Sequence, residues 1–215
     1  MKLRFAIPAG AVITLLAAGP LAAQQWEIGG GVGFGAVRQL GVSSGNLSGK
    51  MGLRHGYLAT AYGGHHLYDR LSGELRYSYR KGSPKVSSGG EQAEMKGEVH
   101  TVAYDFLLQA RDREARLRPY LAFGGGVKVY RGTGIESAFQ PLSRFILLTS
   151  TQHTLPLLSV GGGLSVRLAP GAVLRFDFRD HVTPYPSKVL QPAPGAQASG
   201  WLHDFLPMVT VGVTF

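Results

Sequence analysis

The chain has 215 residues, 31 of them glycine, with no cysteine and a formal charge of +9. For an exported chain, the lack of cysteine excludes a disulfide scaffold. Beyond the N-terminal region, no segment approaches the ~20 apolar residues of a membrane-spanning helix. The net charge favours anionic lipid head groups over nucleic acid as a partner, because nucleic acid is not expected outside the cell interior.

Residues 1–23 have the pattern of a cleavable signal peptide. A basic start at Lys2 and Arg4 precedes an apolar stretch that ends in small residues, and cleavage is expected after Ala23. A retained anchor helix is the alternative, but prolines and glycines interrupt the segment and it is short for a span. We therefore expect one mature domain over 24–215, an ordinary size for a single domain.

The mature chain contains eight stretches in which apolar residues alternate with polar or small ones. Period two indicates extended strands with two unlike faces. Most of the stretches are longer than the ~9–11 residues that a tilted membrane strand needs. The expected strands are 25–37, 51–65, 69–81, 98–111, 118–130, 154–168, 171–181 and 204–215. The second of these is the least polarised between its faces.

The connections between these strands alternate in length. Four are long, at 38–50, 82–97, 131–153 and 182–203. Three are short, at 66–68, 112–117 and 169–170. An up-and-down membrane barrel has long outer loops and short periplasmic turns in this order. Strand alternation alone also fits a soluble barrel of the lipocalin type, with its apolar face turned inward, and this is the rival fold class.

The third long connection differs from the others because it contains the apolar run Phe145-Ile146-Leu147-Leu148. Three interpretations stay open for this run. It extends the sixth strand outward, folds back over the rim of the barrel, or contacts a ligand. Extension or packing is favoured over a ligand contact.

The last stretch, Phe205–Phe215, has an apolar residue at every second position and ends on an aromatic. An unpaired apolar strand of this kind invites aggregation, so we expect it to pair with 27–37, close the barrel and face lipid. Aromatic residues also recur on the apolar faces near strand ends, as interfacial girdles require. These expected anchors are Trp26, Phe34, Tyr77, Tyr79, Phe178, Phe205 and Phe215.

These patterns resemble the small outer-membrane β-barrels of the OmpA/OmpX type over the whole mature chain. The ending Thr210–Phe215, TVGVTF, is similar to the C-terminal signal that the outer-membrane assembly machinery reads in that family, with Val211, Val213 and Phe215 as the signal residues. The segment Arg118–Val127, RPYLAFGGGV, also resembles strands of that superfamily.

The resemblance implies an all-β fold, an eight-stranded antiparallel up-and-down transmembrane β-barrel, in the outer membrane of a Gram-negative-type bacterium. Outer-membrane lipid, lipopolysaccharide and the assembly machinery are then the expected partners, and a monomer is expected.

Charged residues of both signs lie on the polar faces of the strands, where we expect them to meet in the lumen. An unpaired buried charge is costly, which favours ion pairs that plug the barrel. The alternative is a narrow cation-lined pore that passes anions, but eight strands rarely leave a channel. The expected network is Glu27, Glu74, Arg76, Arg80, Asp105, Arg111, Lys128, Arg167, Arg175, Asp177 and Arg179.

The seven histidines do not predict a metal site, a cofactor or a catalytic centre. Only His65 and His66 are close in the sequence, and adjacent strand residues point to opposite faces. In the family of barrels that deacylate lipid A, a histidine and the serine nucleophile that it orients lie two residues apart on one strand, and no histidine here has a serine two positions on. The predicted function is therefore structural or adhesive, with a barrel that displays four mobile outer loops. A small pore is the alternative, and a lipid A-modifying enzyme is less favoured.

Overall fold

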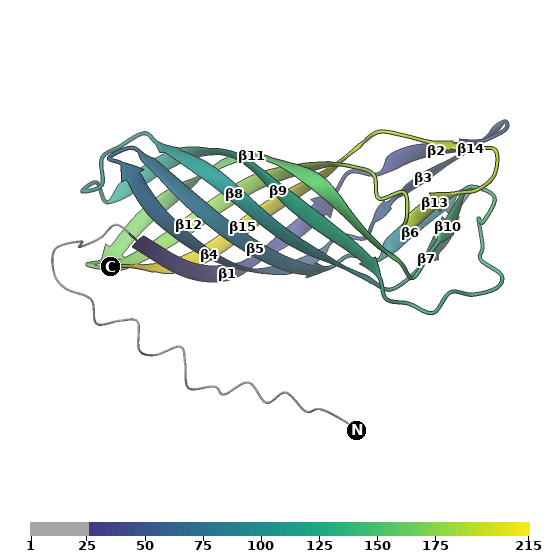
Figure 1. Ribbon diagram of the computed structural model, residues 1–215, viewed down its shortest axis with the longest axis horizontal. Helices are drawn as coiled ribbons and strands as arrows, with labels where there is room; N and C mark the ends of the chain where they lie inside the picture. The colour runs from purple at the N-terminus through teal and green to yellow at the C-terminus, as the bar shows by residue number, and fades with distance from the viewer. Residues whose placement is uncertain (1–25) are drawn as a thin grey trace, which may run out of the picture.

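The computed structural model describes residues 26–215, so the predicted signal peptide lies outside the described residues. Strands dominate the described chain (Figure 1), and no helix within it is long and apolar enough to cross a membrane. Eight long strands close an antiparallel barrel: β1 (Trp26–Val37), β4 (Gly56–Tyr68), β5 (Leu71–Lys81), β8 (Gly97–Gln109), β9 (Leu117–Gly132), β11 (Gln152–Ala169), β12 (Ala172–Pro184) and β15 (Trp201–Thr214).

The barrel closes where β1 pairs with β15. Glu27 lies opposite Thr214, and Val37 lies opposite Asp204 at the other end of the ladder. The remaining barrel strands each pair with their neighbours along the chain, which is an up-and-down topology. The predicted fold class and the predicted pairing of the last strand with the first are therefore confirmed.

The outer face of the barrel is apolar and exposed. Leu121 is 65% exposed and Val211 is 54% exposed, and each alternates with a buried neighbour that faces the lumen. A soluble barrel would turn its apolar face inward and its polar face toward water. The observed faces have the opposite orientation, as in a transmembrane barrel, so the soluble alternative is wrong.

Short turns connect the barrel strands at one end, which we call the turn end; both ends of the described chain lie there (Figure 1). Asp69–Arg70 and Pro170–Gly171 are two-residue turns, and Gly171 has φ of +78°, a conformation that favours glycine. The turn-end connection between β8 and β9 is longer, because β8 ends at Gln109 and β9 begins at Leu117. The predicted short connections are thus confirmed, with shifted boundaries.

The four long connections form a folded structure at the other end, which we call the head. A five-stranded sheet is built from β14 (Ala196–Ala198), β2 (Leu40–Ser44), β3 (Leu47–Leu53), β6 (Pro84–Ser88) and β7 (Glu91–Glu94). A separate pair is formed by β10 (Ile146–Leu148) and β13 (Leu190–Pro192). One prediction is corrected here, because the second barrel strand begins at Gly56 and 47–53 belongs to the head. The connections that were predicted as mobile loops contain short paired strands.

The head has an apolar core of its own. Phe145 and Ile146 are completely buried in it. The apolar run of the third connection therefore packs inside the head and pairs with β13, and it does not extend β11. The core consists of Val42, Met51, Val86, Ala93, Met95, Leu142, Phe145, Ile146, Leu148 and Leu190.

Candidate functional site

A second apolar cluster lies where the head meets the barrel. Its members come from β1, β3, β8, β9, β11 and β15 and from the connection before β13, so they converge from around the barrel wall. Each is at least 91% buried, so little water reaches them. The cluster, which we call the apolar seal, consists of Val37, Leu53, Val99, Tyr130, Leu155, Val189 and Leu202.

The first charged layer below the apolar seal is centred on Asp204. Its Oδ2 atom accepts from Lys128 Nζ at 2.6 Å and from Arg80 Nη2 at 2.8 Å. The three side chains come from β15, β9 and β5, so one carboxylate joins three strands across the lumen. Arg80 and Lys128 belong to the predicted network, whereas Asp204 does not. Its inward position could have been found from the same alternation, because Leu206 and Met208 on its face are also buried.

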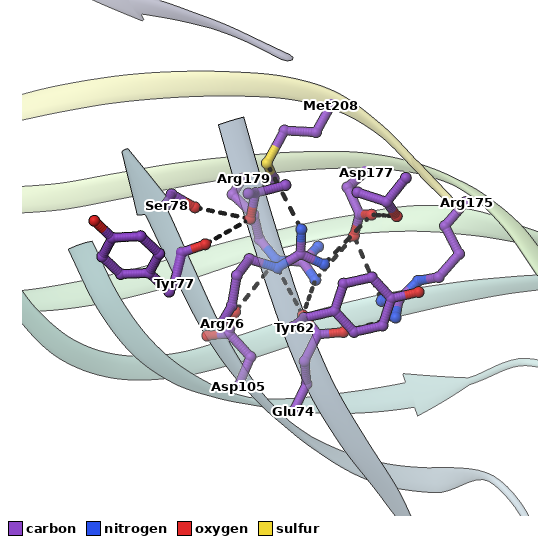
Figure 2. A network of polar contacts seen from close by, with 12 residues as sticks. Tyr62, Glu74, Arg76, Tyr77, Ser78, Asp105, Arg175, Asp177, Arg179 and Met208 are labelled. Carbon is purple, nitrogen blue, oxygen red and sulfur yellow. Dashed lines mark hydrogen bonds and ion pairs between the residues drawn. The ribbon is translucent and has the colours of Figure 1, made fainter. Parts of the chain in front are cut away.

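The middle of the lumen is filled by ion pairs around Glu74 (Figure 2). Glu74 Oε1 accepts from Arg76 Nε at 2.7 Å, and Glu74 Oε2 accepts from Arg175 Nη1 at 2.6 Å. The same Arg175 nitrogen lies 3.3 Å from Glu27 Oε1. All but Glu27 are almost fully buried, so these charges interact in a medium of low dielectric constant, where paired charges attract strongly and unpaired ones are costly.

Arg179 links the remaining acids of the middle layer. Its Nη2 atom lies 3.1 Å from Asp177 Oδ1, and its Nε atom lies 3.4 Å from Asp105 Oδ2. Arg76 approaches the second oxygen of Asp177 at 3.5 Å, which joins this group to the Glu74 group (Figure 2). The result is one connected network rather than separate pairs, in which Glu74 and Asp177 each compensate more than one cation.

Two tyrosines whose inward position was not predicted complete the network. The Tyr62 hydroxyl donates to Glu27 Oε1 at 2.6 Å, and the Arg175 guanidinium lies 4.6 Å from the Tyr62 ring centre, a cation–π distance. The Tyr120 hydroxyl donates to Asp177. Glycines make room for Tyr62, because a Cβ atom on Gly29 or Gly212 would lie 2.6 Å or less from the tyrosine. The glycine-rich inner face of β1 is thus explained by close approach.

The charges of these two layers cancel. Five cations and five acids take part in them, and each cation contacts at least one acid. An eight-stranded barrel is just wide enough for side chains to fill it, and these side chains do so without a net charge. The ten residues are Arg76, Arg80, Lys128, Arg175, Arg179, Glu27, Glu74, Asp105, Asp177 and Asp204.

Two residues of the predicted network lie outside it. Arg111 is exposed, because β8 ends at Gln109 and the alternation cannot continue past the end of the strand. The placement of Arg111 in the lumen is therefore corrected. Arg167 faces inward near the turn end and is partly buried, and its guanidinium donates to the backbone carbonyl of Arg113 rather than to an acid of the network.

The predicted aromatic anchors all lie on the outer face of the barrel. Tyr79 and Phe205 are half-buried against neighbouring side chains, whereas the others are exposed. Phe178 stacks on Phe205 with ring centres 6.2 Å apart, and Trp26 lies 5.2 Å from the His65 ring. These positions leave the aromatic rings free to contact lipid. The residues of the predicted assembly signal, Val211, Val213 and Phe215, are exposed on the same face.

The histidines are distributed around the barrel rather than clustered. Within residues 26–215, no group of three or more His, Cys, Asp or Glu side chains is arranged to hold a metal ion. The register does place Ser159 opposite His181, a pair that no spacing along one strand could reveal. Both side chains are almost completely buried, at 0% and 2% exposure, so a substrate outside the barrel does not reach them.

Comparison with known proteins supports the fold. No family model and no curated protein matches the sequence. Among solved structures, neisserial surface protein A is similar, with a TM-score of 0.53 and 13% identity over 88% of this chain and 97% of that chain. The N-terminal β-barrel domain of Pseudomonas aeruginosa OprF has a TM-score of 0.47 and 15% identity over 90% and 99% of the two chains.

The attachment invasion locus protein of Yersinia pestis, Ail, has a TM-score of 0.42 and 10% identity over 89% and 99%. The likeness to neisserial surface protein A, together with the closed barrel, shows that this chain has the fold of the small eight-stranded outer-membrane β-barrels.

Proposed function

We propose that the chain is a structural and display protein of the outer membrane, in which a sealed barrel holds a folded extracellular head. The observation that carries this proposal is the set of buried ion pairs, with five cations and five acids, beneath the apolar seal. Buried ion pairs joined across several strands resist separation, because breaking one leaves an uncompensated charge. Such an interior suits a rigid support better than a passage for ions.

The exposed apolar belt supports placement in the outer membrane. Closed barrels satisfy every backbone hydrogen bond within the wall, so they can span lipid. Short turns face the periplasm and long connections face outward in such barrels, which puts the head outside the cell. Lipid and lipopolysaccharide then surround the belt, and the assembly machinery reads Val211, Val213 and Phe215. We propose that the protein is a monomer, because the strands of one chain are enough to close the barrel.

Fractionation tests this placement. The protein should be recovered with the outer membrane, and its migration on mild-detergent gels should change on heating, because folded barrels resist that detergent. Recovery in the soluble periplasmic fraction would contradict the placement. The ion pairs in the lumen do not depend on this placement.

The head suits adhesion because its apolar core holds the connections, and so the outer surface of the head, in one conformation. Ordering a mobile loop on binding costs free energy, and a surface that is already ordered avoids that cost. Phe145 and Leu190 are fully buried and tie the third and fourth connections together. Cells that express the chain should therefore adhere to epithelial monolayers more than cells with an empty vector, and equal adhesion would contradict the adhesive role.

Planar-bilayer recordings test the sealed lumen. The wild-type protein should give no reproducible ion-selective conductance. A Leu155→Ala variant, which weakens the apolar seal but leaves every charge in place, should also be silent because the ion-pair layers remain. Reproducible conductance by the wild type would favour the small pore instead.

No enzymatic role is proposed, and a direct measurement tests this choice. Lipid A extracted from expressing and non-expressing cells should have identical mass spectra. The buried Ser159 and His181 pair has no access to lipid outside the wall. A change in acylation or head group on expression would revive the enzymatic alternative.

A further inference from the structure

The turn end of the barrel contains a cavity of about 400 Å³ with an excess of cationic side chains. Two acids line it, Glu27 and Glu114. Glu27 already accepts from Tyr62 at 2.6 Å and from Arg175 at 3.3 Å. Four arginines line the same cavity: Arg113, Arg116, Arg118 and Arg167. The lining thus carries four positive and two negative charges, and one of the two acids, Glu27, is shared with the ion pairs of the lumen.

The fold holds these arginines together. Arg118 on β9 lies opposite Ser165 on β11, so Arg167, two residues further along, projects from the same face of the neighbouring strand. The Arg167 amide donates to the Arg116 carbonyl at 2.8 Å, and its guanidinium donates to the Arg113 carbonyl. The connection is therefore tied to β11. Like charges on adjacent strands destabilise a sheet unless something compensates them.

Arg118 points most directly to a missing anion. The residue is 9% exposed, and it lines the cavity. Its Nε and Nη2 atoms are buried and have no hydrogen-bond partner among the described residues. A buried charged donor without an acceptor carries the full cost of its desolvation, so an acceptor in the cavity would stabilise the fold as well as bind.

We propose that this cavity binds a dianionic phosphate group, either free or carried on a larger molecule. The planar guanidinium fork matches the oxygens of a phosphate with two parallel hydrogen bonds, and a dianion matches the charge excess of the lining. The ligand enters from the turn end, which under the proposed orientation is the periplasm. The site does not depend on the role of the head, so its test and the adhesion test can fail separately.

Titration calorimetry of the refolded protein in a neutral detergent tests the site. Inorganic phosphate, added at constant ionic strength, should bind one ion per chain. Arg118→Gln should weaken binding at least tenfold, because it removes the buried donors. Arg111→Gln is the matched control, because it also removes one positive charge from the turn end, but Arg111 does not line the cavity. This variant should bind phosphate as tightly as the wild type does.

Two results would overturn the site. One is the absence of phosphate binding by the wild type, and the other is equal weakening in Arg118→Gln and Arg111→Gln, which would indicate non-specific attraction to the basic turn end. If Arg118→Gln does not refold to the heat-modifiable form, Arg167→Gln takes its place. This variant should also bind phosphate at least tenfold more weakly. Phosphate affinity equal to that of the wild type would overturn the site.

A lipid arm distinguishes the sources of the phosphate. Protein in bilayer discs of neutral lipid should bind inorganic phosphate and glycerol phosphate alike. When the discs contain phosphatidic acid, weaker apparent binding of added phosphate assigns the site to a lipid head group, and unchanged binding assigns it to a soluble phosphate. Both results support a phosphate site, whereas loss of binding in neutral discs contradicts it.

Discussion

The lumen and the head bury their side chains by opposite means. Arg179 at the centre of the lumen and Ile146 in the head are both completely buried, yet one is surrounded by carboxylates and the other by apolar side chains. The barrel strands present their most apolar faces to the outside, so the inside carries the charged residues, together with small clusters of apolar ones such as Leu206 and Met208. The head strands follow the rule for water-soluble sheets and turn their apolar faces inward. The position of the solvent thus decides which chemistry fills an interior.

The largest effect is expected when one charge is removed from the lumen. Glu74→Gln leaves Arg76 and Arg175 without their closest carboxylate, and breaking a buried pair costs about 3–5 kcal/mol. Urea titration of protein folded in lipid vesicles should show a lower midpoint of unfolding. The double variant Glu74→Gln, Arg76→Gln removes both charges and should recover part of the loss. An unchanged midpoint in the single variant would mean that the lumen does not depend on its ion pairs.

A cavity in the head should cost somewhat less and act locally. Leu190→Ala removes a completely buried side chain, and such changes cost about 3 kcal/mol. Limited proteolysis should then cleave the head connections faster, while the barrel keeps its heat-modifiable migration. Leu47→Ala is the control because Leu47 is half exposed on β3. Equal protection of Leu190→Ala and wild type would contradict an independent apolar core.

Overpacking of the lumen should have an intermediate to small effect. A Cβ atom at Gly212 would lie 2.5 Å from the Tyr62 hydroxyl, and overpacking of this kind costs about 1–3 kcal/mol. The control is Gly63→Ala, because a Cβ there meets no atom within 4 Å. Gly212→Ala should lower the midpoint of urea unfolding and Gly63→Ala should not. Similar midpoints for the two would show that the lumen has room to spare.

The smallest effect is expected at the exposed ion pair of the turn end. Arg70 Nε donates to Asp112 Oδ1 at 2.8 Å and holds the pKa of that carboxyl below its ordinary range. Because the pKa is lowered in the folded state, the stabilisation is present above the pKa of the unfolded state and is lost as the pH falls through the folded value. Both side chains are exposed, so this stabilisation is small, and Asp112→Asn should lower the urea midpoint at neutral pH less than Gly212→Ala does. A shift comparable to that of Glu74→Gln would remove the distinction between buried and exposed pairs.

The barrel was predictable because its evidence is local. Along β8, buried Asp105 alternates with exposed Tyr104 and Phe106, and a strand of this length repeats the pattern often enough to identify both faces. The same alternation indicated the inward positions of Arg76 and Arg179. It failed at Arg111, which lies beyond the end of the strand, and at residues 51–55, where a head strand and a break precede β4.

The head, the ion-pair partners and the arginine cavity depend on contacts between residues far apart in the sequence. Head strands of three to seven residues span too few repeats to reveal a period. Asp204 meets Arg80 and Lys128 only because β15 pairs with β1 and closes the wall, which sets the height of every side chain in the lumen. The alternating pattern therefore specifies which side of the wall a residue faces. Closure and register specify which residues it meets there, because those depend on pairing between strands and not on the order of residues within one.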